Sequence, residues 1–376
     1  MRKRTYRYLI ASASIALLLA GCGNNDNEVG SKDLEASQET KLIVDELNRE
    51  VEIPGTLDSI VMGGILPYFS TWFIATNSTE EIAGIHPNSY NAASHSILKE
   101  ISPSILDAKT NFIENGEVNV EELLSLDPDV YFEIANQEKT VKKLEDTGIT
   151  TVALDTATDS LNPLDTLNRW LTLTGEITGV TDRPAEIIAE GEENQQMIYD
   201  TLDEAGIEEK DMPRVMVLQY HNNGEISVAG TGMHGNRWLN STGGIDVAAE
   251  EVDGIKAVNM EQIYKWNPDI IYITNFTETQ PEDLYNNVFE SQDWSEVKAV
   301  QDKKVYKMPL GIYRWYPPSG DAPLMLKWMA QKNHPDLFTY DMNEEIKDYY
   351  KRYYSYDLTD TQVEEILNPP SEAAKY

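Results

Sequence analysis

A stretch of this chain occurs twice, and the repeat narrows the folds that are open to it. Residues 119–132 read NVEELLSLDPDVYF, and residues 259–272 read NMEQIYKWNPDIIY. In each copy an asparagine suits a helix N-cap, a glutamate follows in the first turn, and Pro-Asp ends the helix before an apolar strand. The second copy lies 140 positions after the first. We therefore expect two lobes built on one plan.

The first residues have the pattern of an export signal. Four basic residues within the first seven precede the apolar run Leu9–Ala20, which is too short to span a bilayer. The following Leu19–Cys22 resembles the bacterial lipobox, in which the signal is cut before a cysteine that is then lipidated. An ordinary signal peptide with a chance cysteine is the alternative. We expect residues 1–21 to be a signal peptide and Cys22 to be lipidated, which places the protein outside the cytoplasm, anchored to the cell membrane.

Cysteine content and charge exclude several function classes. Cys22 is the only cysteine, which rules out a disulfide within the chain and argues against a cysteine-based metal site. Removing residues 1–21 takes away four basic residues and no acidic ones, so the formal charge goes from −34 to −38. Such acidity argues against nucleic acid as a partner and against broad contact with anionic lipid. A basic residue in a cleft would therefore stand out.

The remaining chain divides by its periodicity. Residues 22–40 are polar and aperiodic, as in a flexible tether. Strands alternate with helices over residues 41–161, which predicts an N-terminal α/β lobe with a parallel sheet, and the polar stretch 86–96 within it is predicted to be a loop. Residues 162–205 have a broad apolar helical face and no convincing strand, so we expect a stiff helical connector. Residues 206–376 then form a C-terminal α/β lobe, which begins with a hairpin.

These features together resemble one family, the class III substrate-binding proteins of ABC importers. The resemblance rests on the lipobox, the two lobes, the connector and the repeated unit, and it covers almost all of residues 41–376. It implies an α/β fold of two Rossmann-like lobes joined by a long connecting helix, with a ligand cleft between the lobes. It also implies a monomer that has no catalytic residues and no cofactor. Such a protein delivers its ligand to an ABC permease dimer with its ATPase subunits.

The family captures iron–siderophore complexes, haem, cobalamin and some metal ions or oxyanions. Residues 308–338 resemble a subgroup usually labelled iron-compound binding, which favours an iron–siderophore complex here. Haem, cobalamin and an oxyanion or metal ion such as molybdate, tungstate or zinc remain alternatives. In this family a glutamate on each lobe docks against arginines of the permease, and the matching residues are Glu121 and Glu261. The alternative is that both glutamates only support the starts of their helices.

Ligands of open α/β sheets bind beyond the carboxyl ends of the strands. Arg314 is our strongest candidate, because an arginine pairs bidentately with anionic groups, and aromatic neighbours would supply contact area for an organic chelate. The alternative is that Trp315 and Tyr316 are core side chains and that Arg314 pairs with an internal acid. The full set of predicted ligand-binding residues is Tyr68, His86, Tyr90, Tyr220, Met233, His234, Arg237, Trp238, Asn275, Tyr313, Arg314, Trp315 and Tyr316.

Three further readings are weaker. Residues 230–235 match G-x-G-x-x-G, but the strand before them looks like one arm of a hairpin, so a glycine turn offering backbone N–H groups to an anion is favoured over a dinucleotide fingerprint. His86 with His221 or His234 could join a carboxylate around a metal, yet no close histidine pair occurs and we predict no metal site. An exported enzyme on the same scaffold would need a convergent acid–base set, and the sequence shows none.

Overall fold

The computed structural model describes residues 39–156, 162–222 and 224–374 of the chain. The predicted signal peptide, Cys22 and nearly all of the predicted tether lie outside the described residues. Residues 39–376 make up one compact unit. Among the described helices, none combines the length and the apolar character needed to cross a bilayer.

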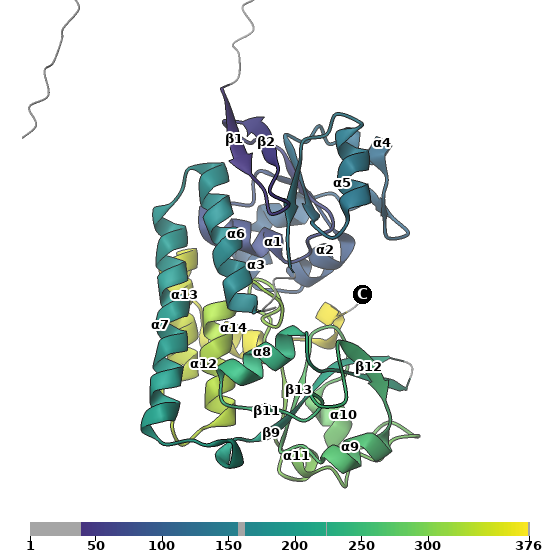
Figure 1. Cartoon of the computed structure of the whole chain (residues 1–376), viewed down its shortest axis with the longest axis vertical. Coiled ribbons are helices and arrows are strands. Elements are labelled where there is room, and N and C mark those ends of the chain that lie inside the picture. The colour runs from purple at the N-terminus through teal and green to yellow at the C-terminus, as the bar shows by residue number, and fades with distance from the viewer. Residues whose placement is uncertain (1–38, 157–161, 223, 375–376) are drawn as a thin grey trace, which may run out of the picture. The chain divides into compact units, whose positions relative to one another are not determined.

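The N-terminal lobe holds a four-stranded sheet with the order β4-β3-β7-β8. Figure 1 shows this lobe in purple and blue, with the helices α1, α2, α4 and α5 labelled. Every neighbouring pair of strands in it is parallel, as predicted from the alternation of strands and helices. Its strands are β3 (Ile60–Met62), β4 (Ile82–Ile85), β7 (Val130–Ile134) and β8 (Thr151–Leu154). Its helices are α1 (Tyr68–Thr76), α2 (Pro87–Ser94), α3 (Leu98–Ile101), α4 (Val120–Leu124) and α5 (Glu138–Glu145). Two hairpins flank the sheet, β1–β2 (Thr40–Val44, Glu50–Pro54) and β5–β6 (Ile113–Glu114, Glu117–Val118).

The helix α2 corrects one prediction, because it occupies most of the stretch that was expected to be a loop. Pro87 stands at its first position, where a missing N–H costs nothing. The Nδ1 atom of His86 caps it by accepting a hydrogen bond from the backbone N–H of Asn88 at 3.1 Å. The polar composition of this stretch led to the prediction of a loop. The pair His86-Pro87, a cap followed by a proline at the first helical position, indicates the helix.

The C-terminal lobe holds a six-stranded mixed sheet with the order β12-β10-β9-β13-β14, and β11 pairs with β9. The predicted hairpin is confirmed, since β9 and β10 pair in antiparallel fashion, whereas β13 pairs with both β9 and β14 in parallel. The strands are β9 (Arg214–Asn222), β10 (Glu225–Ala229), β11 (Ile245–Asp246), β12 (Ile255–Val258), β13 (Ile270–Ile273) and β14 (Val305–Lys307). The helices are α8 (His234–Ser241), α9 (Met260–Trp266), α10 (Pro281–Tyr285), α11 (Lys298–Gln301), α12 (Ala322–Asn333), α13 (Met342–Tyr354) and α14 (Asp360–Leu367). A single 3-10 turn, η3 (Ser371–Ala374), follows α14.

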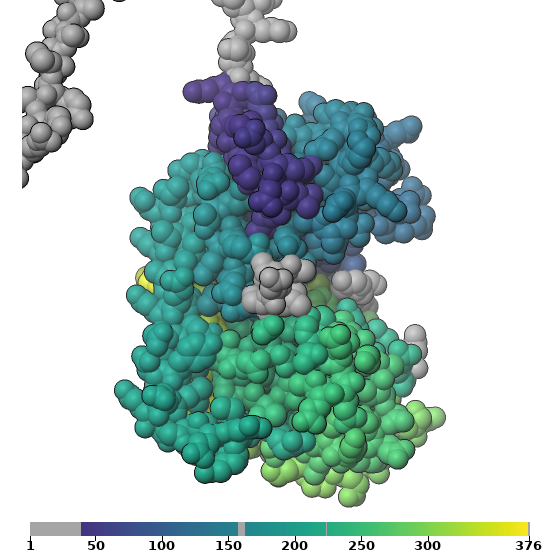
Figure 2. Space-filling model, in the orientation of Figure 1, coloured from purple at the N-terminus to yellow at the C-terminus, as the bar shows by residue number. Residues whose placement is uncertain are grey.

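The predicted helical connector over residues 162–205 consists of two helices, α6 (Pro163–Thr178) and α7 (Asp182–Glu204). Gly179 ends α6 in the left-handed conformation at φ 79°, which is open to glycine because it has no Cβ. The two helices pack against each other, and α6 also contacts α1 while α7 contacts α12. Their teal surface borders both lobes in Figure 2.

One apolar core runs through both lobes. It takes Met62 and Phe132 from the N-terminal sheet, Val217 and Tyr272 from the C-terminal sheet, and Trp170 from the connector. The alternate residues of the same strands face separate outer cores, as Val61 and Met216 do. Both sheets are thus covered on both faces, as parallel strands require.

The two copies of the repeated unit have equivalent surroundings. Asn119 caps α4 by accepting from the N–H groups of Glu121 and Glu122, at 3.1 and 3.3 Å, and Asn259 caps α9 by accepting from the N–H of Gln262 at 3.0 Å. Next come residues in the left-handed region, Asp127 at φ 44° and Asn267 at φ 43°.

Each Pro-Asp aspartate then binds the start of the first core strand of its lobe. Asp129 Oδ2 accepts from the N–H of Ser59 at 2.9 Å, and Asp269 Oδ2 accepts from the N–H of Arg214, also at 2.9 Å. The strands that follow, β7 and β13, pair in parallel with β3 and β9 respectively. The prediction of two lobes on one plan is therefore confirmed down to single hydrogen bonds.

Candidate ligand-binding site

A cavity of about 760 Å³ lies at the carboxyl ends of the strands of the C-terminal sheet. It is bounded by the end of β9, by the segment that follows β13, by α10 and by the turn η3. Its lining residues are His221, Asn222, Phe276, Glu278, Thr279, Gln280, Asp283, Val288, Phe289, Ser371 and Ala374. This is the edge at which an open α/β sheet is expected to bind a ligand.

Three buried polar atoms at this edge have no hydrogen-bond partner among the described residues. They are Oε1 of Gln219, Nε2 of His221 and Oδ1 of Asn275. Gln219 and His221 end β9, and Asn275 follows β13, the neighbouring parallel strand. A buried polar group without a partner costs about 1–3 kcal/mol, so a cluster of them marks a place where a polar ligand or water is expected.

Lys307, the last residue of β14, brings a positive charge to the same edge. Its Nζ donates to the carbonyl oxygens of Thr277 and Thr279, at 2.6 and 2.9 Å. Burial, followed by the nearby Arg314, lowers the pKa of Lys307 to about 7. Both carbonyls belong to the segment after β13 that helps to form the cavity. Lys307 therefore stabilises this segment through two hydrogen bonds without lining the cavity itself.

Arg314 is completely buried beside this cavity. Its Nη1 donates to the hydroxyl of Tyr313 at 3.1 Å, and its Nη2 donates to the carbonyl oxygen of Ala373 at 3.2 Å. The guanidinium carbon lies 4.9 Å from the ring centroid of Phe276, which lines the cavity. Phe276 and the η3 turn therefore separate the guanidinium from the open space.

The structure places five of the predicted aromatic contacts in the core, and none of the five lines this cavity. Tyr68, Trp238, Tyr313, Trp315 and Tyr316 are each at most 1% exposed. All five have internal hydrogen bonds. The hydroxyl of Tyr68 bonds to Thr174 at 2.8 Å, Nε1 of Trp315 donates to Asp321 at 3.0 Å, and Nε1 of Trp238 donates to the Tyr316 carbonyl at 2.8 Å. The hydroxyls of Tyr313 and Tyr316 accept from Arg314 and from the amide of Gly235. We leave these five out of the ligand surface because they are buried. The prediction included them because an aromatic residue in the sequence is equally typical of a core and of a binding site.

Of the remaining predicted residues, Asn275 is buried, and the others lie in partly exposed positions. The ring of Tyr220 is 6.0 Å from Phe276, and the ring of His234 is 5.9 Å from Tyr316. Met233 precedes α8 and Arg237 lies on it, both half-buried, and Nε of Arg237 has no hydrogen-bond partner among the described residues. Tyr90 donates to the carbonyl of Leu106 at 3.1 Å.

His86 lines a second cavity, of about 470 Å³, at the carboxyl ends of the N-terminal strands. Glu133, at the end of β7, lines it as well, and burial raises the pKa of its carboxyl group. The two cavities occupy the same edge in each lobe. The sequence prediction missed Glu133, Gln219, Lys307 and η3. A charged residue at the end of an apolar strand, as in VYFE and VYK, was the available signal for two of them.

Two weaker readings can be placed as well. In the glycine turn, the amide of Gly230 donates to the carbonyl of Gly254 at 2.9 Å, and the amide of Gly235 donates to the hydroxyl of Tyr316 at 3.2 Å, so both are engaged within the protein. Within residues 39–156, 162–222 and 224–374, no group of three or more His, Cys, Asp or Glu side chains is arranged to hold a metal ion.

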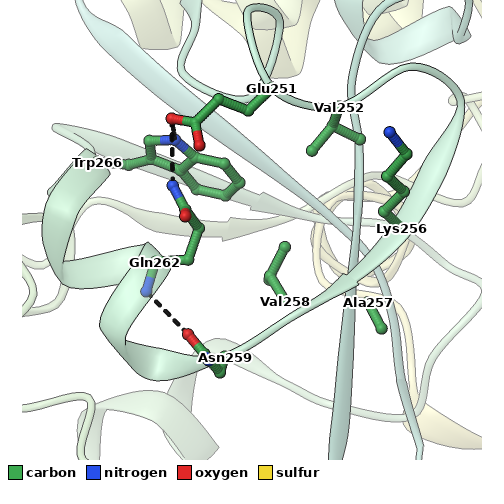
Figure 3. Close-up of a pocket in the computed structure, with 8 residues that line it drawn as sticks. All are labelled: Glu251, Val252, Lys256, Ala257, Val258, Asn259, Gln262 and Trp266. Atoms are coloured by element: carbon green, nitrogen blue, oxygen red, sulfur yellow. Dashed lines mark hydrogen bonds between the residues drawn. The ribbon is translucent and has the colours of Figure 1, made fainter.

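A third hollow, of about 430 Å³, lies beside α9, the helix that carries Glu261. Figure 3 shows Glu251 above Trp266 and Gln262 below it, with Lys256 across the hollow. Nε1 of Trp266 donates to Oε1 of Glu251 at 3.3 Å. None of its lining residues lies at a carboxyl end of β9, β13 or β14, so we do not assign the ligand to it.

Comparison with known proteins agrees with this geometry. The sequence profile of the periplasmic binding protein family matches residues 72–310, which reach from α1 to the strand end before Arg314. The chain therefore belongs to the periplasmic binding protein family, as the resemblance in the sequence implied.

Two curated relatives and one solved structure illustrate the match. The chain is 26% identical over 338 residues to the molybdate-binding protein MolA of Haemophilus influenzae, covering 84% of this chain and 91% of MolA. It is 25% identical over 321 residues to the iron(3+)-hydroxamate-binding protein FhuD of Bacillus subtilis, covering 81% and 91%. A periplasmic solute binding protein from Veillonella parvula superimposes with a TM-score of 0.79 at 31% identity, covering 88% of this chain and 97% of that one. The protein is thus an extracytoplasmic solute-binding protein and not an enzyme, and its relatives are substrate-binding components of ABC transporters.

Proposed function

We propose that this protein captures a small anion at Arg314 and delivers it to an ABC permease. The observation that carries the proposal is a buried guanidinium beside a cavity at the carboxyl ends of the strands, with Lys307 bonded to a segment that forms part of the cavity wall. In a chain of formal charge −34, two cations buried at one edge stand out from the surface. Arginine suits this role because its planar fork matches the oxygens of an anion.

The ligand class favoured by the site is a tetrahedral oxyanion of the molybdate type. The five aromatic rings that would have stacked on an organic chelate are in the core, whereas His221 lines the cavity and Gln219, Asn275 and Arg314 lie buried at the carboxyl ends of the same strands. The similarity to a molybdate-binding protein supports the same choice.

An iron–siderophore complex, the ligand expected from the sequence, is the second candidate. Phe276 and Phe289 line the cavity, and its volume of about 760 Å³ is within the range of sites for organic ligands. The similarity to an iron(3+)-hydroxamate-binding protein favours this candidate as well.

Delivery is assigned to Glu121 and Glu261. Each lies exposed in the first turn of a helix of the repeated unit, and the two helices have equivalent places in the two lobes. Two equivalent carboxylates suit a permease dimer, which offers the same basic surface twice. Cys22 is proposed to carry the lipid that keeps the protein at the membrane.

The test is calorimetric titration of the chain lacking residues 1–22 with sodium molybdate, sodium tungstate and a ferric hydroxamate complex. We expect saturable binding of the two oxyanions with a stoichiometry of one. Binding of the ferric complex alone would transfer the assignment to the second candidate. No binding of any of the three would contradict an anion site at Arg314.

A further inference from the structure

The short turn η3 (Ser371–Ala374) contacts both lobes. From the N-terminal lobe, Nδ2 of Asn91 on α2 donates to the carbonyl oxygens of Glu372 and Ala373, at 3.2 and 3.5 Å. From the C-terminal lobe, Arg314 donates to the carbonyl of Ala373 at 3.2 Å. Ala373 and Ala374 are almost fully buried by these contacts. The turn therefore crosses from one lobe to the other at the place where the ligand is expected.

The carbonyl of Ala373 occupies a donor position of Arg314 that an anion would use. A backbone carbonyl is a neutral acceptor, and its hydrogen bond to a guanidinium is weaker than that of an anionic oxygen. Ser371 and Ala374 also line the main cavity, so the turn closes one side of the space next to Arg314. A ligand that accepts a hydrogen bond from Nη2 of Arg314 in place of the Ala373 carbonyl has to displace this turn.

Few apolar contacts hold the turn in place. Its two buried side chains are alanines, which bury little apolar area compared with a Leu or Phe. Ser371 is half-buried and Glu372 is exposed. Pro369 and Pro370 separate the turn from α14, so α14 can stay packed when the turn leaves.

We propose that Ser371–Ala374 is a displaceable strap that competes with the ligand for Arg314 and so sets the affinity of the site. This inference rests on the proposed function of Arg314. In the ligand-free protein the strap accepts a hydrogen bond from Nη2 of the buried guanidinium and links the lobes through Asn91. On binding, the anion takes the place of the Ala373 carbonyl, and the strap moves away from the cavity.

The experiment compares the affinity for sodium molybdate of the chain lacking residues 1–22 with that of the same chain ended after Pro370. Removing the competitor should tighten binding about three- to tenfold, the effect of losing one or two modest hydrogen bonds in competition. Asn91→Ala loosens the strap from the N-terminal lobe and should tighten binding in the same direction by a smaller factor. Asn88→Ala, a half-buried asparagine on the same helix, is the matched control and should leave affinity within twofold.

A second readout follows the strap itself. The chain lacking residues 1–22 contains no cysteine, so Ser371→Cys can carry a single environment-sensitive fluorophore. Molybdate should shift its emission with the same midpoint as the calorimetric titration. Equal or weaker binding after truncation, or an unchanged emission while calorimetry shows binding, would overturn the strap and leave the proposed function standing. An absence of heat with every variant would instead overturn the oxyanion function, and the strap with it.

Discussion

At the scale of single residues, Arg314 and Lys307 distinguish this protein from a merely acidic α/β scaffold. Both lie at the carboxyl edge of the C-terminal sheet, and both donate to backbone carbonyls of segments that form the cavity wall. The charge of Arg314 is shielded from solvent, which strengthens its interaction with an anion that enters the site. Lys307, whose pKa burial lowers to about 7, adds a second full charge only below that pH.

Replacing Arg314 by lysine keeps the charge but removes the planar fork. We expect Arg314→Lys to weaken molybdate binding by about 10–100-fold, the range for losing a charge-assisted hydrogen bond. Isothermal titration measures this loss. Arg352→Lys is the control, since Arg352 is an exposed residue of α13 whose partners Asp348 and Glu190 lie outside the cavity. Wild-type affinity in Arg314→Lys would remove this residue from the site.

Lys307 predicts how stability depends on pH. Its pKa is about 7 in the folded protein, compared with 10.5 for an unperturbed lysine. Between these values the unfolded chain holds a proton that the folded protein lacks, so the free energy of unfolding rises with pH, by roughly 1.4 kcal/mol per pH unit at most. Below pH 7 both states are protonated and this contribution is constant.

Lys307→Met isolates the effect, because methionine has no titrating group. Urea unfolding at pH 7 and pH 9 should show a larger gain in stability for the natural protein than for the variant. The variant will be less stable at both pH values, since the carbonyls of Thr277 and Thr279 lose their donor. Equal pH slopes for the two proteins would show that the lysine is not held neutral by burial.

At the scale of elements, the repeated helices α4 and α9 present one glutamate each. The caps by Asn119 and Asn259 fix these helices whether or not the glutamates are present, so charge reversal should leave the fold intact. We expect the double variant Glu121→Lys and Glu261→Lys to abolish ligand uptake by cells while molybdate affinity is unchanged. Uptake of radiolabelled molybdate measures this.

The matched control reverses two glutamates outside the repeated unit. Glu192 on α7 and Glu209 in the turn after it are exposed, and reversing both changes the net charge by the same amount. This control should transport normally. Loss of uptake in the control, or normal uptake in the Glu121 and Glu261 variant, would show that docking does not depend on these two positions.

The sequence predicts an element well where the residues that determine the element lie within it or next to it. The repeated unit, the first strands and the hairpin follow from caps, periodicity and turn residues, and all of them are present. The aromatic residues around Arg314 were misplaced because burial depends on partners distant in sequence. Trp315 is held by Asp321, and Asp321 also accepts from the hydroxyls of Tyr350 and Tyr354 on α13. The strap could not be predicted from the sequence either. Ala373 lies 59 residues from Arg314, and it contacts Arg314 through a backbone carbonyl, which any residue has.

At the scale of the whole molecule, one core shared by both lobes and the connector predicts a stiff receptor. Close-packed cores resist continuous deformation, so closure on a ligand should be small. The strap offers a way for ligand to reach Arg314 without a large rotation of the lobes, because only a four-residue turn has to move.

The position of the bound anion tests the central claim most directly. A crystal structure of residues 39–376 grown with sodium molybdate, with anomalous data collected at the molybdenum edge, would locate the metal atom. We predict one strong peak at the carboxyl edge of the C-terminal sheet, with the oxyanion hydrogen-bonded to the guanidinium of Arg314 and the Ala373 carbonyl displaced. A peak in the hollow beside α9, or molybdate bound elsewhere while Arg314 still donates to Ala373, would contradict it.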